Sequence, residues 1–179
     1  MTHPYLLFTT EISGDTSISR REREHTAVNS LLREAFGRDI EVAHTQDGAP
    51  YLEAHPDTHI SISHGIDTCV LAVSSEPIGV DIETAREQLK RVAHKFLTPQ
   101  EHARWSTLAD ETEGMLFLLM AWTAKEAVFK AALTPGLVLS EIAIDSDFTT
   151  AESRGKHYTL TYPTVSSRRA IAIAFPTGI

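Results

Sequence analysis

Apolar and polar positions in the first half of the chain follow three different patterns. The stretch YLLFTT, residues 5–10, is rich in aromatic and β-branched side chains, which predicts a strand. Between residues 20 and 36 the apolar side chains recur at helical spacing and Gly37 follows them, so an amphipathic helix is expected to end there. In HISISH, residues 59–64, isoleucine and serine alternate, which predicts a strand whose serines face away from the core.

The second half of the chain predicts further strands and two helices. The runs CVLAVSS (69–75) and IGVDIE (78–83) flank turn residues, so they are expected to pair as a hairpin. A helix is predicted to begin after Thr98, with Glu101 completing a capping box, and a longer helix is predicted over roughly 113–132. The alternating runs YTLTY and AIAIAF predict a closing hairpin.

The order of these elements predicts an α+β fold with two lobes. Strand, helix and strands occur once before about residue 75 and again, with more helices, after it. We therefore expect residues 1–75 and 76–179 to form the two lobes. No sequence repeat is visible, so this expectation rests on element order alone.

Composition narrows the possible function classes. The net charge of −8 argues against a nucleic-acid-binding protein, which gathers a basic face to neutralise phosphates. The longest apolar run, residues 115–122, is far shorter than the roughly 20 residues of a membrane-spanning helix. Cys69 has no partner for an internal disulfide, and the N-terminus does not resemble a signal peptide. We expect a cytoplasmic protein that binds neither nucleic acid nor membrane.

Two segments concentrate positive charge in this acidic chain. They are SRRER, which contains Arg20, Arg21 and Arg23, and REQLKRVAHK at 86–95. Each is typical of a solvated helix face, and each also suits a local anion-binding surface. The charge pattern alone leaves both interpretations open.

The end of the run IGVDIE carries a pair of carboxylates. Asp81 and Glu83 are two residues apart, so in a strand both side chains project from one face. Like charges this close raise each other's proton affinity unless a cation lies between them. A divalent metal would be such a cation, and the alternative is that the pair marks a solvent-facing strand end.

The motif WTAKEAVFK, residues 122–130, helps to distinguish a metal site from a solvent-facing strand end. Trp122, Glu126 and Lys130 are spaced by four residues and share one stripe of the predicted helix. A glutamate and lysine at this spacing are commonly a surface ion pair. The preceding turn is apolar almost all round, however, which is typical of a buried helix whose charged stripe needs partners. Trp122 itself is expected to pack in the core.

A combination of the two motifs would form a site for magnesium. With Glu126, the carboxylates of Asp81 and Glu83 would supply the oxygen ligands that magnesium prefers, and Lys125 and Lys130 would complement phosphates. Zinc fits less well, because the chain has one cysteine and a proline interrupts its histidine pair at helical spacing.

Four motifs together resemble one family. SISHG (61–65), IGVDIE (78–83), KFLTPQE (95–101) and WTAKEAVFK (122–130) occur in the order and at the separations of the 4′-phosphopantetheinyl transferases, most closely those of the larger, two-lobed type. Members of this family activate carrier proteins of fatty-acid, polyketide and peptide synthesis. The resemblance implies two similar α/β lobes related by a pseudo-twofold axis, with the active site between them and complete within a monomer.

The same resemblance implies roles for individual residues. Magnesium held by Asp81, Glu83 and Glu126 is expected to bridge the pyrophosphate of coenzyme A. Ser63 and His64 match positions that contact the coenzyme near its 3′-phosphate and pyrophosphate.

The implied reaction is phosphopantetheine transfer, as in a holo-[acyl-carrier-protein] synthase. A serine of an apo acyl or peptidyl carrier protein attacks the β-phosphorus of coenzyme A, and 3′,5′-ADP leaves. Lys130 would stabilise charge on the phosphates, and Glu126 would take the serine proton, directly or through a water; the sequence does not decide which. The basic segment 86–95 is expected to dock an acidic carrier protein.

The chain departs from the family pattern at one phosphate contact. The family often has a lysine between glycine and proline where this chain has Ala49. A basic residue of the N-terminal segment would compensate, and Arg23 is the one we select. Glu101 carries two interpretations, as a helix cap and as the family's acidic residue near the metal and its lysine. The missing lysine keeps open a coenzyme A or nucleotide-binding relative without transfer activity, and three carboxylates also suit a magnesium-dependent phosphohydrolase.

Overall fold

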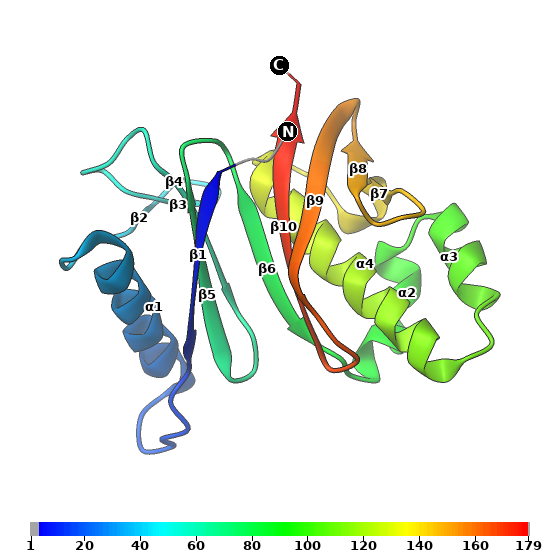
Figure 1. Ribbon diagram of the computed structural model, residues 1–179, viewed down its shortest axis with the longest axis horizontal. Coiled ribbons are helices and arrows are strands. Elements are labelled where there is room, and N and C mark those ends of the chain that lie inside the picture. Colours follow the sequence, from blue (N-terminus) through cyan, green and yellow to red (C-terminus); the bar gives the residue numbers. More distant parts are fainter. Residues whose placement is uncertain (1–3, 179) are drawn as a thin grey trace.

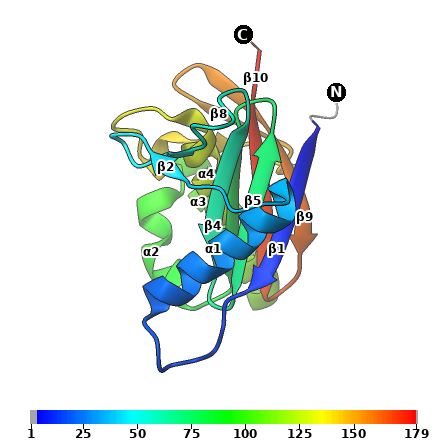
Figure 2. The same cartoon turned by 90° about the vertical axis from the view of Figure 1, so that its left-hand side faces the viewer.

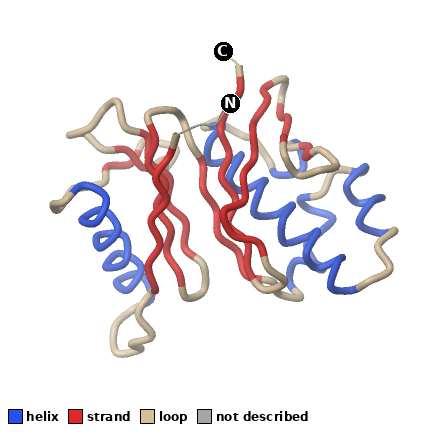
Figure 3. Tube along the Cα trace, viewed as in Figure 1, coloured by secondary structure: helices blue, strands red, loops and turns tan. Residues whose placement is uncertain are grey.

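The computed structural model describes residues 4–178 and has a mixed α/β fold with two large sheets standing side by side (Figure 1, Figure 3). The outermost residues of the two predicted lobes, 1–3 and 179, lie outside the described residues. Within the range 4–178, no helix combines the length and the hydrophobicity needed to cross a bilayer.

The N-terminal sheet is antiparallel and carries one helix on its outer face. Its strands, in spatial order, are β1 (Tyr5–Glu11), β5 (Thr68–Ser74) and β4 (His59–His64). Helix α1 (Arg20–Phe36) lies across this sheet (Figure 2) and buries Leu31 and Leu32 against it. Ser19 caps its start through a capping box, and Gly37 ends it with a left-handed φ of 70°. The predicted helix 20–36 is confirmed.

The C-terminal sheet is larger and is also antiparallel between neighbours. Its strands, in spatial order, are β6 (Gly79–Thr84), β10 (Arg169–Thr177), β9 (Lys156–Val165), β8 (Thr150–Ser153) and β7 (Ala143–Ile144). Helix α4 (Glu111–Ala132) packs against β6 and β10 on one face (Figure 1). The long helix and the closing hairpin predicted from the sequence are both confirmed.

Shorter elements complete the fold. Helices α2 (Gln88–Phe96) and α3 (Pro99–Ser106) pack beside α4, and the 3₁₀ helix η1 (Leu139–Glu141), β2 (Ala43–His44) and β3 (Pro50–Tyr51) lie in connections. Helix α3 begins as predicted, because Thr98 and Glu101 form its capping box. Helix α2 contains most of the basic segment 86–95 and was not predicted as a separate element.

The predicted hairpin between residues 69–75 and 78–83 is wrong. β5 is the central strand of its sheet, so β1 and β4 occupy both of its edges and none is left for β6. β6 pairs instead with β10 from the far end of the chain. An apolar run with flanking turn residues indicates a strand, but it does not select the partner of that strand.

One core cluster joins the two sheets. Val70 and Ala72 of β5 pack with Val80 and Ile82 of β6 and with Ile173 of β10, and all five are buried. The face of β5 opposite α1 therefore packs against the C-terminal sheet rather than facing solvent. This shared core fixes β4 and β6 next to each other.

Gly79 permits a close approach of α4 to β6. A Cβ built on Gly79 would overlap the carbonyl oxygen of Ala127 and lie 2.7 Å from the nitrogen of Ala131. The absence of a side chain thus lets the helix backbone lie directly on the strand. This contact sets Glu126 and Lys130 over the strand that carries the carboxylate pair.

Candidate active site

Asp81 is the most enclosed of the predicted metal ligands, with 5% of its surface exposed. Its Oδ1 accepts hydrogen bonds from Ser63 Oγ at 2.7 Å and from Lys130 Nζ at 2.7 Å. Its Oδ2 is buried, and no donor among the described residues bonds to it. A buried carboxylate oxygen without a partner costs free energy unless a ligand supplies one.

Glu83 and Glu126 add two half-buried carboxylates near Asp81. Burial raises the pKa of Glu83, and the charge of Asp81 raises it further, against an opposing effect of Arg86. Burial also raises the pKa of Glu126, where the charges of Asp81 and Glu83 add to the shift and Lys130 opposes it. Glu126 therefore lies in the field of both other carboxylates, and Glu83 lies in the field of Asp81.

The donor chemistry of these residues fits a hard divalent cation. All three groups offer carboxylate oxygens, the buried Oδ2 of Asp81 lacks a donor, and a cation would relieve the mutual repulsion. Within residues 4–178, however, no three such side chains already have the geometry of a metal site. The magnesium site at Asp81, Glu83 and Glu126 therefore stays a prediction.

Lys130 and Trp122 connect helix α4 to this strand. The Nζ of Lys130 donates to the carbonyl of Val80 at 3.0 Å as well as to Asp81. The ring of Trp122 packs edge-on against Phe96, with centroids 5.0 Å apart, and its Nε1 donates to Glu83 at 3.1 Å. Trp122 thus packs as expected and also orients a carboxylate, which the helical spacing did not reveal.

The structure contradicts the assignment of Lys125 to the coenzyme phosphates. Its side chain is fully buried, and its Nζ lies 2.7 Å from the carboxylate of Glu101 and donates to the carbonyls of Leu139 and Ile142. Burial lowers its pKa, while Glu101 opposes the shift. An enclosed ammonium whose hydrogen bonds are satisfied within the protein cannot reach a phosphate in solvent.

Glu101 explains the buried position of Lys125, because its carboxylate has two roles. Its Oε2 accepts from the backbone nitrogen of Thr98, as a capping residue should, and also pairs with Lys125. Its Oε1 accepts from the backbone nitrogen of Ile144 at 2.9 Å. The carboxylate therefore joins α3, α4 and β7, and its lysine partner is Lys125, whereas Lys130 pairs with Asp81.

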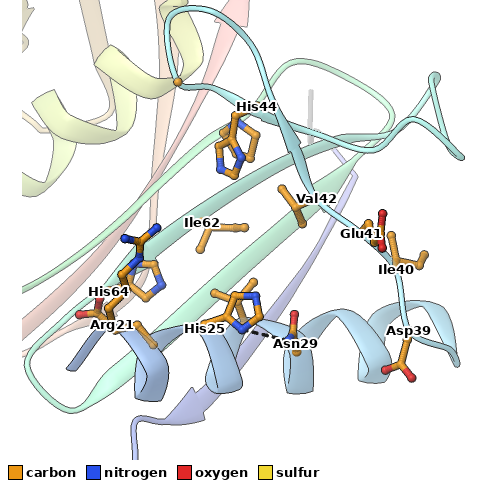
Figure 4. A pocket seen from close by; sticks show the side chains of 14 residues that line it. Arg21, His25, Asn29, Asp39, Ile40, Glu41, Val42, His44, Ile62 and His64 are labelled. Carbon is orange, nitrogen blue, oxygen red and sulfur yellow. Dashed lines mark hydrogen bonds between the residues drawn. The ribbon is translucent and has the colours of Figure 1, made fainter. Parts of the chain in front are cut away.

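A large cavity lies on the N-terminal side of the carboxylates. It has a volume of about 940 Å³ and is bounded by α1, β4 and the segment that carries β2 and β3 (Figure 4). Its polar lining includes Arg21, Glu24, His25, His44 and His64, and its apolar lining includes Val42 and Ile62. In Figure 4, Arg21 and His64 are at one end. His64 follows Ser63 in β4, and the hydroxyl of Ser63 bonds to Asp81, so this end of the cavity is the one nearest to Asp81 in the chain.

Ser63 and His64 take different positions although they are neighbours in the chain. The imidazole of His64 lines the cavity, as expected for a coenzyme contact, and burial lowers its pKa. Ser63 is buried, with 6% exposed, and its hydroxyl points to Asp81 and β6 rather than into the cavity. The expectation that Ser63 faces away from the core is wrong, because β6 packs over that face of β4. Its contact with the coenzyme stays a prediction.

Arg23 is also placed differently from our prediction. It does not line the cavity; one of its terminal nitrogens donates to the carbonyl of Ser13 at 2.8 Å. Arg21, two residues earlier, does line the cavity, and Arg20 donates to the carbonyl of Gly65 at the end of β4. Side chains two residues apart on a helix point about 200° away from each other. Only one of Arg21 and Arg23 can therefore face β4.

Sequence reasoning missed two imidazoles in the cavity. His25 lies on α1 and His44 on β2, and neither belongs to a recognisable motif. His44 lies shortly before the glycine-alanine-proline turn at 48–50, of which Gly48 and Pro50 also line the cavity, whereas His25 had no local signal apart from its place in the predicted helix.

A comparison with models of protein families shows to which family the chain is related. Residues 77–174, more than half of the chain, match the model of the 4′-phosphopantetheinyl transferase superfamily. The chain belongs to this superfamily. The matched region of this phosphopantetheinyl transferase-type chain contains Asp81, Glu83, Glu126 and Lys130.

Curated members of the superfamily align over part of their length. A 4′-phosphopantetheinyl transferase from Bacillus subtilis is 32% identical over 108 residues, which are 59% of this chain and 48% of that protein. Enterobactin synthase component D from Escherichia coli (strain K12) is 41% identical over 97 residues, which are 49% of this chain and 39% of that protein. The chain spans about two fifths to a half of the length of these relatives.

A solved structure of the superfamily shows a weaker similarity. The holo-[acyl-carrier-protein] synthase from Thermotoga maritima is 17% identical, with a TM-score of 0.43 over 56% of this chain and 62% of that one.

Proposed function

We propose that this chain transfers 4′-phosphopantetheine from coenzyme A to a serine of an apo carrier protein and releases 3′,5′-ADP. The observation that carries the proposal is that a cavity and a cluster of carboxylates with a lysine lie next to each other. A cavity lined by Arg21 and His64 lies at the end of β4, where the neighbouring Ser63 bonds to Asp81, beside β6 and the helix that carries Glu126 and Lys130. The cavity suits a nucleotide with an extra phosphate, and the carboxylates with Lys130 suit its pyrophosphate.

In this proposal, the two lobes have different roles in binding coenzyme A and in the reaction. Residues 1–75 form the lobe that holds the adenosine part of coenzyme A, and residues 76–179 form the lobe that holds the metal and reacts. The two lobes are related by a pseudo-twofold axis, and one chain acts as a monomer in the cytoplasm.

A magnesium ion held by Asp81, Glu83 and Glu126 would neutralise charge on the pyrophosphate. Lys130 adds a second cation at the same carboxylate, because its ammonium lies 2.7 Å from Asp81 Oδ1. Transfers of this kind depend on positioning and charge neutralisation more than on covalent help. The protein therefore contributes binding geometry, and the attacking hydroxyl belongs to the carrier.

Glu126 is the base that we propose for the carrier serine. Burial and the neighbouring carboxylates raise its pKa, which brings its basicity closer to the working pH than that of a free glutamate. Among residues 4–178, no hydrogen bond from the protein occupies its carboxylate. One of its oxygens could therefore take the serine proton, directly or through a water, while the other serves the metal.

Intact mass of an apo acyl carrier protein tests the proposal directly. The carrier is incubated with the wild-type chain, coenzyme A and magnesium, and with EDTA in a parallel sample. A gain of one phosphopantetheine that is absent in EDTA and in Asp81→Asn supports the transferase. Holo-[acyl-carrier-protein] synthase activity requires the fatty-acid carrier to react; a reaction with a peptidyl carrier alone would assign the chain to peptide synthesis instead.

Ala49 favours one competing function, a coenzyme A-binding relative without transfer. It lies between the cavity-lining Gly48 and Pro50, and it supplies no charge. Binding of coenzyme A without any mass gain across several carriers would establish this alternative. Release of free phosphopantetheine without a carrier would instead indicate a phosphohydrolase.

A further inference from the structure

The two sheets are connected at β4 and β6 by serine hydroxyls instead of a backbone ladder. The backbone nitrogen of Val80 donates to Ser61 Oγ at 2.9 Å, and that of Ile82 donates to Ser63 Oγ at 3.4 Å. Both serines are buried, with 4% and 6% of their surface exposed. On the edge of β6 opposite β10, the two serine hydroxyls thus accept hydrogen bonds from buried backbone nitrogens. Buried backbone groups require such partners.

Ser61 and Ser63 differ in one further contact. The hydroxyl of Ser63 also donates to Asp81 Oδ1 at 2.7 Å. A hydroxyl has a single hydrogen to donate, so this bond commits the donor capacity of Ser63 to the carboxylate. Ser61 makes the same kind of contact to β6 from two residues earlier, but no bond from it to a carboxylate occurs in the described residues.

The orientation of Asp81 follows from the two donors at Oδ1. Ser63 from β4 and Lys130 from α4 hold this oxygen from different elements. A carboxylate fixed at one oxygen has little freedom at the other. Oδ2 is left buried and without a donor among residues 4–178, which is the arrangement expected of an oxygen that a cation would bind.

We propose that Ser63 is a positioning residue, which holds Asp81 through Oδ1 so that Oδ2 is directed at the divalent cation. The inference rests on the proposed function for the identity of that cation. Groups that orient the ligands of a metal commonly change its affinity by about 10-fold to 100-fold when they are removed. Ser63 acts in this way without touching the coenzyme, because it does not line the cavity.

A comparison of Ser63→Ala with Ser61→Ala tests the inference. Both variants remove one buried hydroxyl from the same strand, and each deprives one nitrogen of β6 of its acceptor. Both are therefore expected to lower the melting temperature, and Ser63→Ala somewhat more, because it also removes a hydrogen bond to a buried carboxylate. Only Ser63→Ala also releases Asp81.

The measured quantity is the apparent Mn²⁺ affinity of the full chain saturated with coenzyme A. Free Mn²⁺ is followed by electron paramagnetic resonance, with coenzyme A alone as the blank. Ser63→Ala is expected to weaken Mn²⁺ binding by about tenfold or more. Ser61→Ala is expected to stay within about twofold of wild type. Coenzyme A affinity measured in EDTA is expected to be unchanged in both variants.

Three outcomes would overturn the inference. Equal loss of Mn²⁺ affinity in both variants would show a general scaffold effect, and no loss in either would show that Asp81 needs no support. Weaker coenzyme A binding in EDTA for Ser63→Ala alone would return Ser63 to the coenzyme site. If the alanine variant does not fold, Ser63→Cys, which keeps most of the volume but donates weakly, is expected to give the same loss of affinity.

The same data separate this inference from the proposed function. A wild-type chain that transfers phosphopantetheine while both serine variants bind Mn²⁺ normally would reject the role of Ser63 and keep the transferase. A wild-type chain that neither binds Mn²⁺ nor transfers would reject both.

Discussion

The ammonium of Lys130 lies 2.7 Å from Oδ1 of Asp81 and 3.0 Å from the carbonyl oxygen of Val80. One cation from helix α4 thereby binds both the side chain and the backbone of strand β6. Because helix and strand are in direct contact at Gly79, Lys130 reaches both groups from above the strand. The relative position of the candidate catalytic groups therefore depends on the packing of one helix on one strand.

Gly79→Ala is expected to be strongly destabilising. The new methyl group would overlap the Ala127 carbonyl, and a helix backbone cannot move aside as a flexible side chain can. Overpacking of this kind costs about 3 kcal/mol or more of unfolding free energy. Urea denaturation measures it. Gly14→Ala is the matched control, since nothing lies within 4 Å of a Cβ at Gly14. Equal stability of the two variants would contradict the close approach.

Glu101→Gln is expected to unfold the protein more readily, because it leaves the ammonium of Lys125 buried without its carboxylate. Removal of one partner from a buried pair costs about 3–5 kcal/mol. The double variant Glu101→Gln/Lys125→Met should recover part of this loss. Thermal and urea unfolding provide the comparison.

Lys125→Met separates a structural lysine from a phosphate-binding one. The structure predicts a loss of stability with coenzyme A affinity unchanged within about twofold, because the side chain is fully buried. Calorimetric titration with coenzyme A measures the affinity. Weaker binding at unchanged stability would restore Lys125 to the coenzyme site.

Coenzyme A affinity is expected to depend on the protonation of His64. Burial lowers the pKa of this imidazole in the free protein, with the charges of Lys130 and Arg20 adding to the shift and Glu24 opposing it. A bound phosphate raises the same pKa, so binding takes up a proton and affinity increases as the pH falls. Dissociation constants measured between about pH 8 and 6 should show this increase.

His64→Gln is the control for that pH dependence. The phosphate itself titrates near pH 6, but it does so with both proteins, so the difference between them isolates the imidazole. The variant should bind more weakly at low pH and approach wild type at high pH. Identical slopes for the two proteins would exclude His64 as the titrating group.

Charge reversal on α2 is expected to weaken carrier docking. Arg91 and Lys95 are exposed on this helix, whereas Arg86 and Lys90 already pair with nearby glutamates. The double variant Arg91→Glu/Lys95→Glu should raise the KM for an acidic carrier by about tenfold at low salt and leave kcat unchanged. Lys156→Glu, an exposed change on β9, should leave KM unchanged. A KM that is equal in both variants and insensitive to salt would remove α2 from the docking surface.

Local signals allowed much of the secondary structure to be predicted. The bounds of α1 and the start of α3 follow from capping residues, which act within one turn of the helix. The carboxylate pair on β6 and the charged stripe on α4 were predicted from spacing, since a side chain's face follows from the period of its element. The closing hairpin of β9 and β10 was predicted because its strands are neighbours in the chain, whereas the pairing of β6 with β10, which are far apart in the chain, was missed.

From the sequence alone, the longer helices and strands, the superfamily motifs and the charges at Asp81, Glu83, Glu126 and Lys130 could be predicted. Which of the polar side chains face the cavity and which are enclosed follows from the packing of distant elements. Ser63 donates a hydrogen bond to Asp81, and Lys125 pairs with Glu101. Another element packs over each of these side chains, and a buried polar group must bond to the groups that lie beside it. The period of a strand or helix gives a direction for each side chain, but the group it meets comes from distant parts of the chain.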